Sequence, residues 1–126
     1  MVVDASAAVL GLLNDGDARR TLATEGLAIP HLADSEVVQA LRQHVRLGKL
    51  SPKHATEVLG RWQRLGVRRY ATVGHLARVW ALKDNVSAYD ATYVALAEAL
   101  GCSLVTGDAR LAAAPGPTCA MVVVRS

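Results

Sequence analysis

Four short runs rich in apolar and β-branched residues alternate with longer helical segments, and this alternation limits the fold more than any other feature of the sequence. The runs are MVV at the start, LAIP ending at Pro30, and CSLVT and TCAMVVV near the end, with VRRYA as a candidate fifth. Parallel strands joined through helices need right-handed crossovers, and the helices then cover both faces of the sheet. The alternation therefore predicts an α/β fold with three layers, in which helices flank a mostly parallel central sheet on both faces.

The helical segments are identified by their apolar spacing and by their start and stop signals. Ser51 and Pro52 have the form of an N-cap followed by proline in the first turn, and Gly101 follows a helix that opens at Ser87. We expect helices at residues 5–15, 17–25, 31–47, 73–83 and 87–100, with another beginning at Ser51. Neither a repeat nor a linker interrupts this pattern, so residues 1–126 are expected to form one domain.

Composition limits the core and the compartment. The 126 residues are 52% apolar but only 4% aromatic, and Phe is absent, so the core has to be built mainly from Ala, Val and Leu. No apolar run approaches the roughly 20 residues of a membrane span, and the N-terminal stretch contains an early acid, Asp4, instead of a basic region. We therefore expect a cytoplasmic protein without a membrane partner.

The two cysteines show no spacing that indicates a function. Cys102 and Cys119 lack the C-x-x-C pattern of a zinc site and the paired pattern of a disulfide scaffold. We interpret them as small buried hydrophobic residues.

Charge is distributed unevenly along the chain. Between Arg42 and Lys83 there are ten Lys or Arg residues and one acid, Glu57, which gives this stretch a charge of +9, while the remainder carries −6 and the whole chain +3. A basic stretch of this kind is typical of a surface that binds a polyanion, although a solvated helix face explains it equally well.

Four acidic residues stand where apolar residues or turns would suffice. Asp4 and Asp108 follow MVV and SLVTG, at the predicted carboxyl ends of two strands. Glu36 lies within a helix, and Asp90 stacks at helical spacing with apolar residues at the head of another. Each has an ordinary explanation: Asp4 and Asp108 can cap the helices that follow, Ser87 and Asp90 fit a capping box, and Glu36 can lie on a solvated edge.

Taken together, the four acids favour convergence on one crevice, because parallel sheets place ligands outside the carboxyl ends of their strands. Carboxylates gathered in this way repel one another and raise each other's pKa unless a cation neutralises them. Oxygen ligands select hard ions such as Mg²⁺ or Mn²⁺, which also activate water for attack on a phosphate. The pattern therefore predicts metal-dependent hydrolysis of phosphodiester bonds.

Four motifs around these acids resemble those of PIN-domain ribonucleases, and in particular the small VapC-type toxins of bacterial toxin–antitoxin pairs. The motifs are VVDASA, SEVVQAL, SAYDATYVALAEALG and LVTGDARL, and they follow one another along essentially the whole chain. The resemblance implies a PIN-like domain and a Mg²⁺- or Mn²⁺-dependent endoribonuclease that leaves a 5′-phosphate. By that resemblance the catalytic, metal-binding acids are Asp4, Glu36, Asp90 and Asp108, with Ser6 and Thr106 as polar supports.

The implied partners are an RNA substrate and a cognate antitoxin protein. A homodimer is also expected, because the helical stretch AAVLGLL is apolar on nearly every side. The alternative for that stretch is burial beneath the second helix. Alternative functions are a housekeeping RNA-processing nuclease, a PIN-like domain that binds without cutting, and a receiver-like signalling domain. The last fits poorly, because VVDAS carries one acid where such a domain needs a pair.

Overall fold

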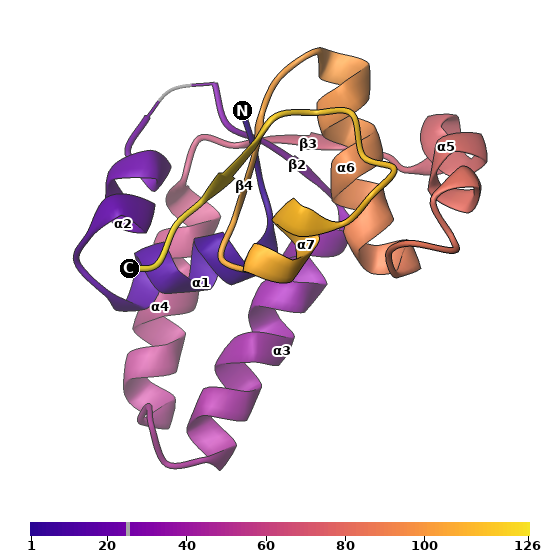
Figure 1. Cartoon of the computed structure of the whole chain (residues 1–126). Helices are drawn as coiled ribbons and strands as arrows, with labels where there is room; N and C mark the ends of the chain where they lie inside the picture. Colours follow the sequence, from indigo (N-terminus) through magenta and orange to yellow (C-terminus); the bar gives the residue numbers. More distant parts are fainter. Residues whose placement is uncertain (25) are drawn as a thin grey trace.

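Five short strands form one parallel sheet in the computed structural model, which describes residues 1–24 and 26–126. The order across the sheet is β3-β2-β1-β4-β5 (Figure 1). The strands are β1 (Val2–Val3), β2 (Ala28–Pro30), β3 (Arg68–Tyr70), β4 (Leu104–Thr106) and β5 (Met121–Val123). The predicted α/β class with a parallel central sheet is confirmed.

The strand order reverses direction between β1 and β4. From β1 the chain continues to β2 and β3 on one side, and it then crosses to β4 and β5 on the other. Val3 is paired with Val105 across this junction. The residues that follow β1 and β4 therefore face each other at the carboxyl edge of the sheet, at the switch point where parallel sheets place their ligands.

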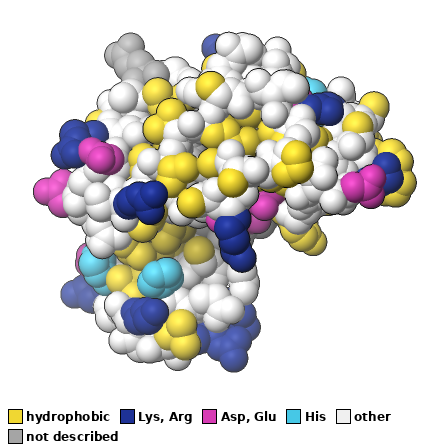
Figure 2. All heavy atoms as spheres, in the orientation of Figure 1, with side chains coloured by type: hydrophobic (Ala, Val, Ile, Leu, Met, Phe, Trp, Pro, Cys, Tyr) yellow, Lys and Arg dark blue, Asp and Glu magenta, His cyan; other side chains and the backbone are white. Residues whose placement is uncertain are grey.

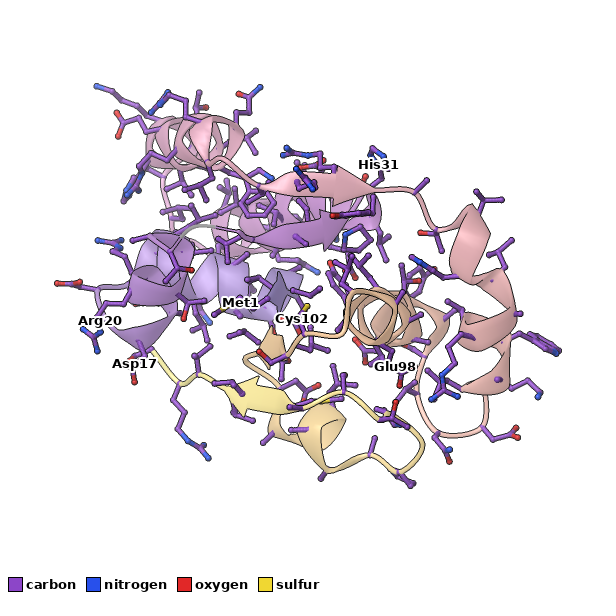
Figure 3. The ribbon with its side chains drawn as sticks, turned by 90° about the horizontal axis from the view of Figure 1, so that it is seen from above. Met1, Asp17, Arg20, His31, Glu98 and Cys102 are labelled. Atoms are coloured by element: carbon purple, nitrogen blue, oxygen red, sulfur yellow. The ribbon has the colours of Figure 1, made fainter. Side chains whose placement is uncertain are left out.

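Helices cover both faces of this sheet. Figure 3 shows α1, α2 and α4 on one side and α5 and α6 on the other, and α3 packs against α1. The helices are α1 (Ala5–Leu13), α2 (Asp17–Leu22), α3 (Leu32–Arg46), α4 (Pro52–Arg64), α5 (Leu76–Ala81), α6 (Ala88–Leu100) and α7 (Ala109–Ala113). The three predicted layers are thus present.

Helices α3 and α4 form a hairpin that projects from the rest of the molecule (Figure 1). Ser51 caps α4 by accepting a hydrogen bond from the His54 N–H at 3.1 Å, as the sequence predicts. The far end of the hairpin is rich in Lys and Arg side chains (Figure 2). The basic stretch therefore lies largely on an exposed arm.

The core consists mainly of Val, Ala and Leu side chains, with Tyr93 among its largest fully buried members. Close packing of α1 on α2 depends on Gly11, where an added Cβ would lie 2.6 Å from Leu22 Cδ1. Val9 and Leu12 of α1 are buried, while Leu10 and Leu13 are partly buried against the same core. The apolar surface of α1 is therefore largely covered within the chain, and it gives no indication of how many copies associate.

Two helices differ in length from the sequence expectation. The helix expected at 73–83 is divided into a 3-10 turn, Val73–His75, and the short α5. Neither part has a fully buried residue, so little tertiary packing is available to extend a helix there. The helix expected at 17–25 ends at Leu22, and its last expected residue, Glu25, lies outside the described residues.

Among the described residues, none of the helices combines the length and the apolar character that a membrane span requires.

Candidate functional site

Asp4 is the first residue after β1 and caps α1. Its Oδ1 accepts hydrogen bonds from the Ala7 N–H at 2.9 Å and from the Ser6 hydroxyl at 2.6 Å. The Thr106 hydroxyl of β4 donates to its Oδ2. Asp4 is only 5% exposed, and three donors fix its carboxylate at the switch point. Asp4 therefore caps α1 and also lies at the edge of the sheet where ligands are expected to bind.

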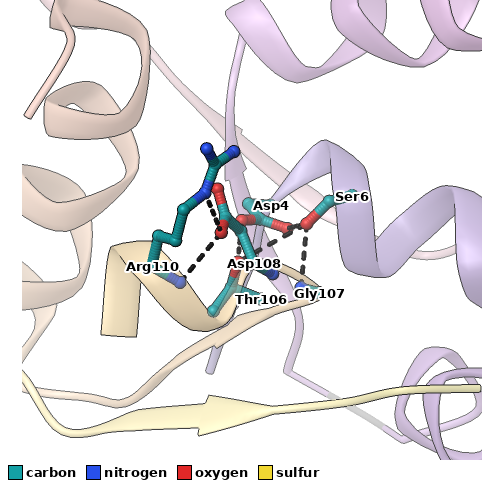
Figure 4. A network of polar contacts seen from close by, with 6 residues as sticks. All are labelled: Asp4, Ser6, Thr106, Gly107, Asp108 and Arg110. Atoms are coloured by element: carbon teal, nitrogen blue, oxygen red, sulfur yellow. Dashed lines mark hydrogen bonds and ion pairs between the residues drawn. The ribbon is translucent and has the colours of Figure 1, made fainter. Parts of the chain in front are cut away.

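The loop after β4 is tied to the start of α1 (Figure 4). The Gly107 N–H donates to Ser6 Oγ at 2.8 Å, and the Asp108 N–H donates to Thr106 Oγ1 at 3.0 Å. A Cβ at Gly107 would lie 2.9 Å from Leu10 Cδ1 and 3.2 Å from Ser6 Oγ, so the loop has little room for a larger residue. Ser6 and Thr106 therefore join the two strand ends and orient Asp4.

Asp108 caps the short helix α7. Its Oδ1 accepts from the Arg110 N–H at 2.9 Å, and the Arg110 Nε lies 3.5 Å from the same oxygen. The Arg110 side chain is 94% exposed, so this ion pair contributes little to stability. An exposed guanidinium is thus present beside the acids.

Glu36 projects from α3 toward α6. The buried Tyr93 hydroxyl donates to Glu36 Oε1 at 2.6 Å, across the carboxyl edge of the sheet. The pKa of Glu36 is raised above its ordinary value of 4.5, mainly by burial, and the negative charges of Asp90 and Asp4 add to the rise. The hydrogen bond from Tyr93 acts in the opposite direction. The expected alternative of a freely solvated edge is wrong for Glu36.

Asp90 lies in the first turn of α6. Ser87 caps this helix by accepting from the Asp90 N–H at 3.1 Å, as the sequence predicts, so Asp90 takes part in the cap through its backbone. Its pKa is raised, first by burial and then by the negative charges of Asp4 and Asp108. The Asp90 carboxylate therefore interacts electrostatically with Asp4 and Asp108, and also with Glu36, whose pKa it raises.

The charges of the four predicted acids thus act on one another, but the carboxylate oxygens do not surround a single point. Among the described residues, no three acidic, histidine or cysteine side chains lie close enough, as they stand, to hold one metal ion. Glu36 is turned to Tyr93 and Asp108 to Arg110. Within the described part of the chain, Asp4, Glu36 and Asp90 form no ion pair with a Lys or Arg side chain.

Sequence reasoning missed two residues at this site, Tyr93 and Arg110. Tyr93 contacts an acid 57 positions away, which local spacing cannot reveal. Its place three residues after Asp90, on the same helix face, was the only available signal. Arg110 stands two residues after Asp108 in a stretch that has the composition of a turn.

A largely apolar cavity of about 570 Å³ opens beside the acids, between α1 and α3. Glu36, Ser6 and Gly107 line the end nearest the acids, and Leu10 and Leu13 line its wall. A ligand in this cavity would therefore contact the acidic edge directly.

Known proteins resemble the chain over nearly its whole length. The family model described as PIN domain matches residues 1–117. Ribonuclease VapC9 of Mycobacterium tuberculosis is 49% identical over 124 residues, which cover 98% of each protein. Ribonuclease VapC1 of the same organism is 43% identical over 129 residues, which cover 98% of this chain and 97% of that protein.

Two solved structures share the fold. The crystal structure of PAE2754 from Pyrobaculum aerophilum superposes with a TM-score of 0.70 at 29% identity, covering 95% of this chain and 81% of that chain. The Sarcin-Ricin loop cleaving toxin VapC20 of Mycobacterium tuberculosis gives a TM-score of 0.62 at 20% identity, covering 89% of this chain and 92% of that chain. The second likeness concerns the fold alone.

Proposed function

Because the chain belongs to the PIN-domain family and, within it, to the VapC ribonucleases, we propose that it is an endoribonuclease toxin that hydrolyses RNA phosphodiester bonds. One observation carries the proposal for the site. The pKa of Asp90 is raised by Asp4 and Asp108, and that of Glu36 by Asp90 and Asp4, in addition to burial. Four carboxylates that repel one another at a switch point destabilise the folded state, and such perturbed groups are typical of catalytic sites.

The donor set fits a hard divalent cation. Asp4, Glu36, Asp90 and Asp108 offer only carboxylate oxygens, which favour Mg²⁺ or Mn²⁺ over zinc. A bound ion of this kind neutralises the acids, polarises a phosphate oxygen and lowers the pKa of an attacking water. We propose these four acids as its ligands.

The protein's own residues prepare the site. Ser6 and Thr106 hold the Asp4 carboxylate by hydrogen bonds to different oxygens, and Tyr93 holds Glu36. Arg110 offers an exposed guanidinium that is suited to bind two oxygens of a phosphate group in a bidentate manner. Their proposed roles are to orient the acids and the RNA backbone for in-line attack.

We propose that the basic stretch from Arg42 to Lys83, most of which lies on the hairpin of α3 and α4, holds the RNA backbone (Figure 2). Arg69 and Arg78 form ion pairs with Asp34 and Glu98, so they are committed within the fold. The other basic residues of the stretch are exposed, and they are Arg42, Arg46, Lys49, Lys53, Arg61, Arg64, Arg68 and Lys83. Phosphate contacts of this type give affinity without sequence preference, and the affinity falls as salt rises.

The proposed toxin has three further attributes. A cognate antitoxin would bind along the cavity between α1 and α3, where an arginine of its tail would reach Glu36 and the neighbouring acids. A homodimer stays part of the proposal. An enzyme that cuts cellular RNA has to act where RNA is found, so the proposal includes the cytoplasm.

Conservative substitutions of the acids test the cleavage site. Asp4→Asn, Asp90→Asn and Asp108→Asn should each abolish RNA cleavage while the far-UV circular dichroism stays that of the wild type. The matched control is Asp15→Asn, since Asp15 is exposed and lies beyond the C-terminal end of α1, whereas Asp4 caps the N-terminal end. Wild-type cleavage by the Asp90→Asn protein would show that the assignment is wrong.

Metal dependence is tested on the same purified protein. Excess EDTA should stop cleavage, and added Mg²⁺ or Mn²⁺ should restore it. Cleavage that persists in EDTA would exclude the proposed cation, and absence of cleavage under every condition would favour a binding domain.

The biological role needs a separate test. Co-expression with the product of a small neighbouring gene should yield a complex that no longer cleaves RNA. If no such gene product binds or inhibits the enzyme, the housekeeping role is favoured over the toxin.

A further inference from the structure

Cys102 and Cys119 stand at equivalent positions before neighbouring strands. Leu104 of β4 is the partner of Met121 of β5 in the parallel register, and each cysteine precedes its strand residue by two positions. The Leu104 N–H donates to the Ala120 carbonyl at 2.9 Å, so the ladder extends to the residue beside Cys119. The two cysteines therefore precede neighbouring strands in register, and both line the same cavity.

The expected separation suits a covalent bond between them. Neighbouring strands lie about 4.8 Å apart, and disulfides join Cα atoms that are about 4.4–6.8 Å apart. Both cysteines are half-buried and line one cavity of about 320 Å³, together with Glu98 and Thr118. The interpretation of these cysteines as ordinary core residues is therefore incomplete, because they share a space that small molecules can enter.

Helix α6 fixes the backbone on both sides of this pair. The Cys102 N–H donates to the Ala97 carbonyl at 3.1 Å, just past the end of the helix. Glu98 of the same helix accepts from the Thr118 N–H at 2.7 Å and from the Thr118 hydroxyl at 2.9 Å. Figure 3 shows Cys102 and Glu98 at this end of α6. The pair is thus held in position without a bond between the sulfur atoms.

We propose that Cys102 and Cys119 form a dithiol site that a low-molecular-weight disulfide oxidises to an intramolecular disulfide. One cysteine thiolate attacks the small disulfide, forms a mixed disulfide and releases one small thiol. The second cysteine thiolate then attacks the protein sulfur and releases the other small thiol. Two electrons pass from the cysteines to the oxidant, and the two protons end on the released thiols.

The environment of the pair sets its resting state. Burial raises the pKa of the Cys119 thiol, and the nearby Glu98 carboxylate and Cys102 thiolate raise it further. Since the thiolate is the reactive form, the raised pKa slows the reaction of Cys119 with a small disulfide, and this reaction should become faster as the pH rises. The bond would close residues 103–118, the segment that carries Thr106, Asp108 and α7.

Oxidation of the purified, reduced full-length chain with oxidised glutathione tests the proposal. The wild type should lose the mass of two hydrogens, and its digest should contain a peptide that joins Cys102 to Cys119. Closing a loop of this size should raise Tm by about 5–10 °C, and dithiothreitol should reverse the rise. Cys102→Ser and Cys119→Ser are matched controls that should gain only glutathione and show no such rise.

Three results would overturn the proposal: glutathione remaining on single cysteines of the wild type, crosslinks between chains, or an oxidised wild type with an unchanged Tm. Should a serine variant fail to fold, the reduced wild type blocked with iodoacetamide at Cys102 and Cys119 replaces it as the control. None of these measurements uses RNA cleavage, so the result is independent of the proposed ribonuclease activity.

Discussion

The hydrogen bond between Tyr93 and Glu36 makes a quantitative prediction for Tyr93→Phe. The substitution removes only the hydroxyl that donates to Glu36 Oε1 at 2.6 Å, and the ring stays in the core, where Tyr93 is 1% exposed. A hydrogen bond to a charged group contributes about 1.5–3 kcal/mol. Because Glu36 is only half-buried, water can replace part of that contribution, so we expect a loss of about 1–2 kcal/mol and a Tm about 4–8 °C lower.

The loss should depend on pH in a defined direction. The pKa of Glu36 is raised above 4.5 by burial, and the bond from Tyr93 opposes this rise. The stabilisation by the bond is therefore present while Glu36 is ionised in the folded state, and it disappears as the pH falls through that raised pKa. The difference in Tm between wild type and variant should shrink from neutral toward acidic pH.

Thermal unfolding followed by circular dichroism measures this difference. Tyr70→Phe is the matched control, because the Tyr70 hydroxyl makes no hydrogen bond within the described part of the chain. In the Glu36→Gln background, Tyr93→Phe should cost less, since the acceptor is then neutral. The reasoning is refuted if Tyr93→Phe behaves like Tyr70→Phe, or if its effect does not change with pH.

Three further predictions concern stability. Asp90→Asn should raise Tm by about 2–4 °C at neutral pH and leave it unchanged below the ordinary pKa of 3.8. Because the folded-state pKa of Asp90 is raised, its destabilising effect begins above 3.8 and is complete above the raised pKa. A lower Tm at neutral pH would contradict this. Gly11→Ala should lower the free energy of unfolding in urea by about 1–3 kcal/mol, because its Cβ would lie 2.9 Å from the carbonyl carbon and oxygen of Ala18, which cannot move aside as the Leu22 side chain can. Glu98→Gln should cost about 1 kcal/mol at neutral pH, where Arg78 pairs with both carboxylate oxygens. The pKa of Glu98 is lowered to about 2, so this cost should disappear in acid titrations toward that pH.

Much of the fold could be predicted from the sequence, because the spacing of apolar residues differs between strands and helices. The alternation predicted the parallel sheet, VRRYA proved to contain β3, and the resemblance to PIN-domain ribonucleases is confirmed. Helix α7 was missed because its five residues are too few to show a period. The division of the segment at 73–83 was missed because the sequence spacing does not show that residues 73–81 lack a fully buried side chain, while Leu82 directly after them is buried.

The site was predictable at the level of residue type and strand position. Asp4 and Asp108 stand directly after strands, so their place at the carboxyl edge follows from parallel topology alone. The partner of Glu36 was not predictable from local spacing, because Tyr93 meets it across a long sequence separation. Thr106, which donates to Asp4, was expected only through the resemblance to PIN-domain ribonucleases. The assignment of the acids as metal ligands stays a prediction.

Helix N-termini explain how this edge tolerates so many acids. Asp4, Ser87 and Asp108 are the N-caps of α1, α6 and α7, so all three helices begin beside the acids. A helix N-terminus carries a partial positive charge and offers free N–H donors, which favour ionised carboxylates. The compensation is incomplete, because the pKa of Asp90 is still raised. The capping residues that start these helices therefore also leave, at one edge, a surplus of negative charge suited to attract a cation.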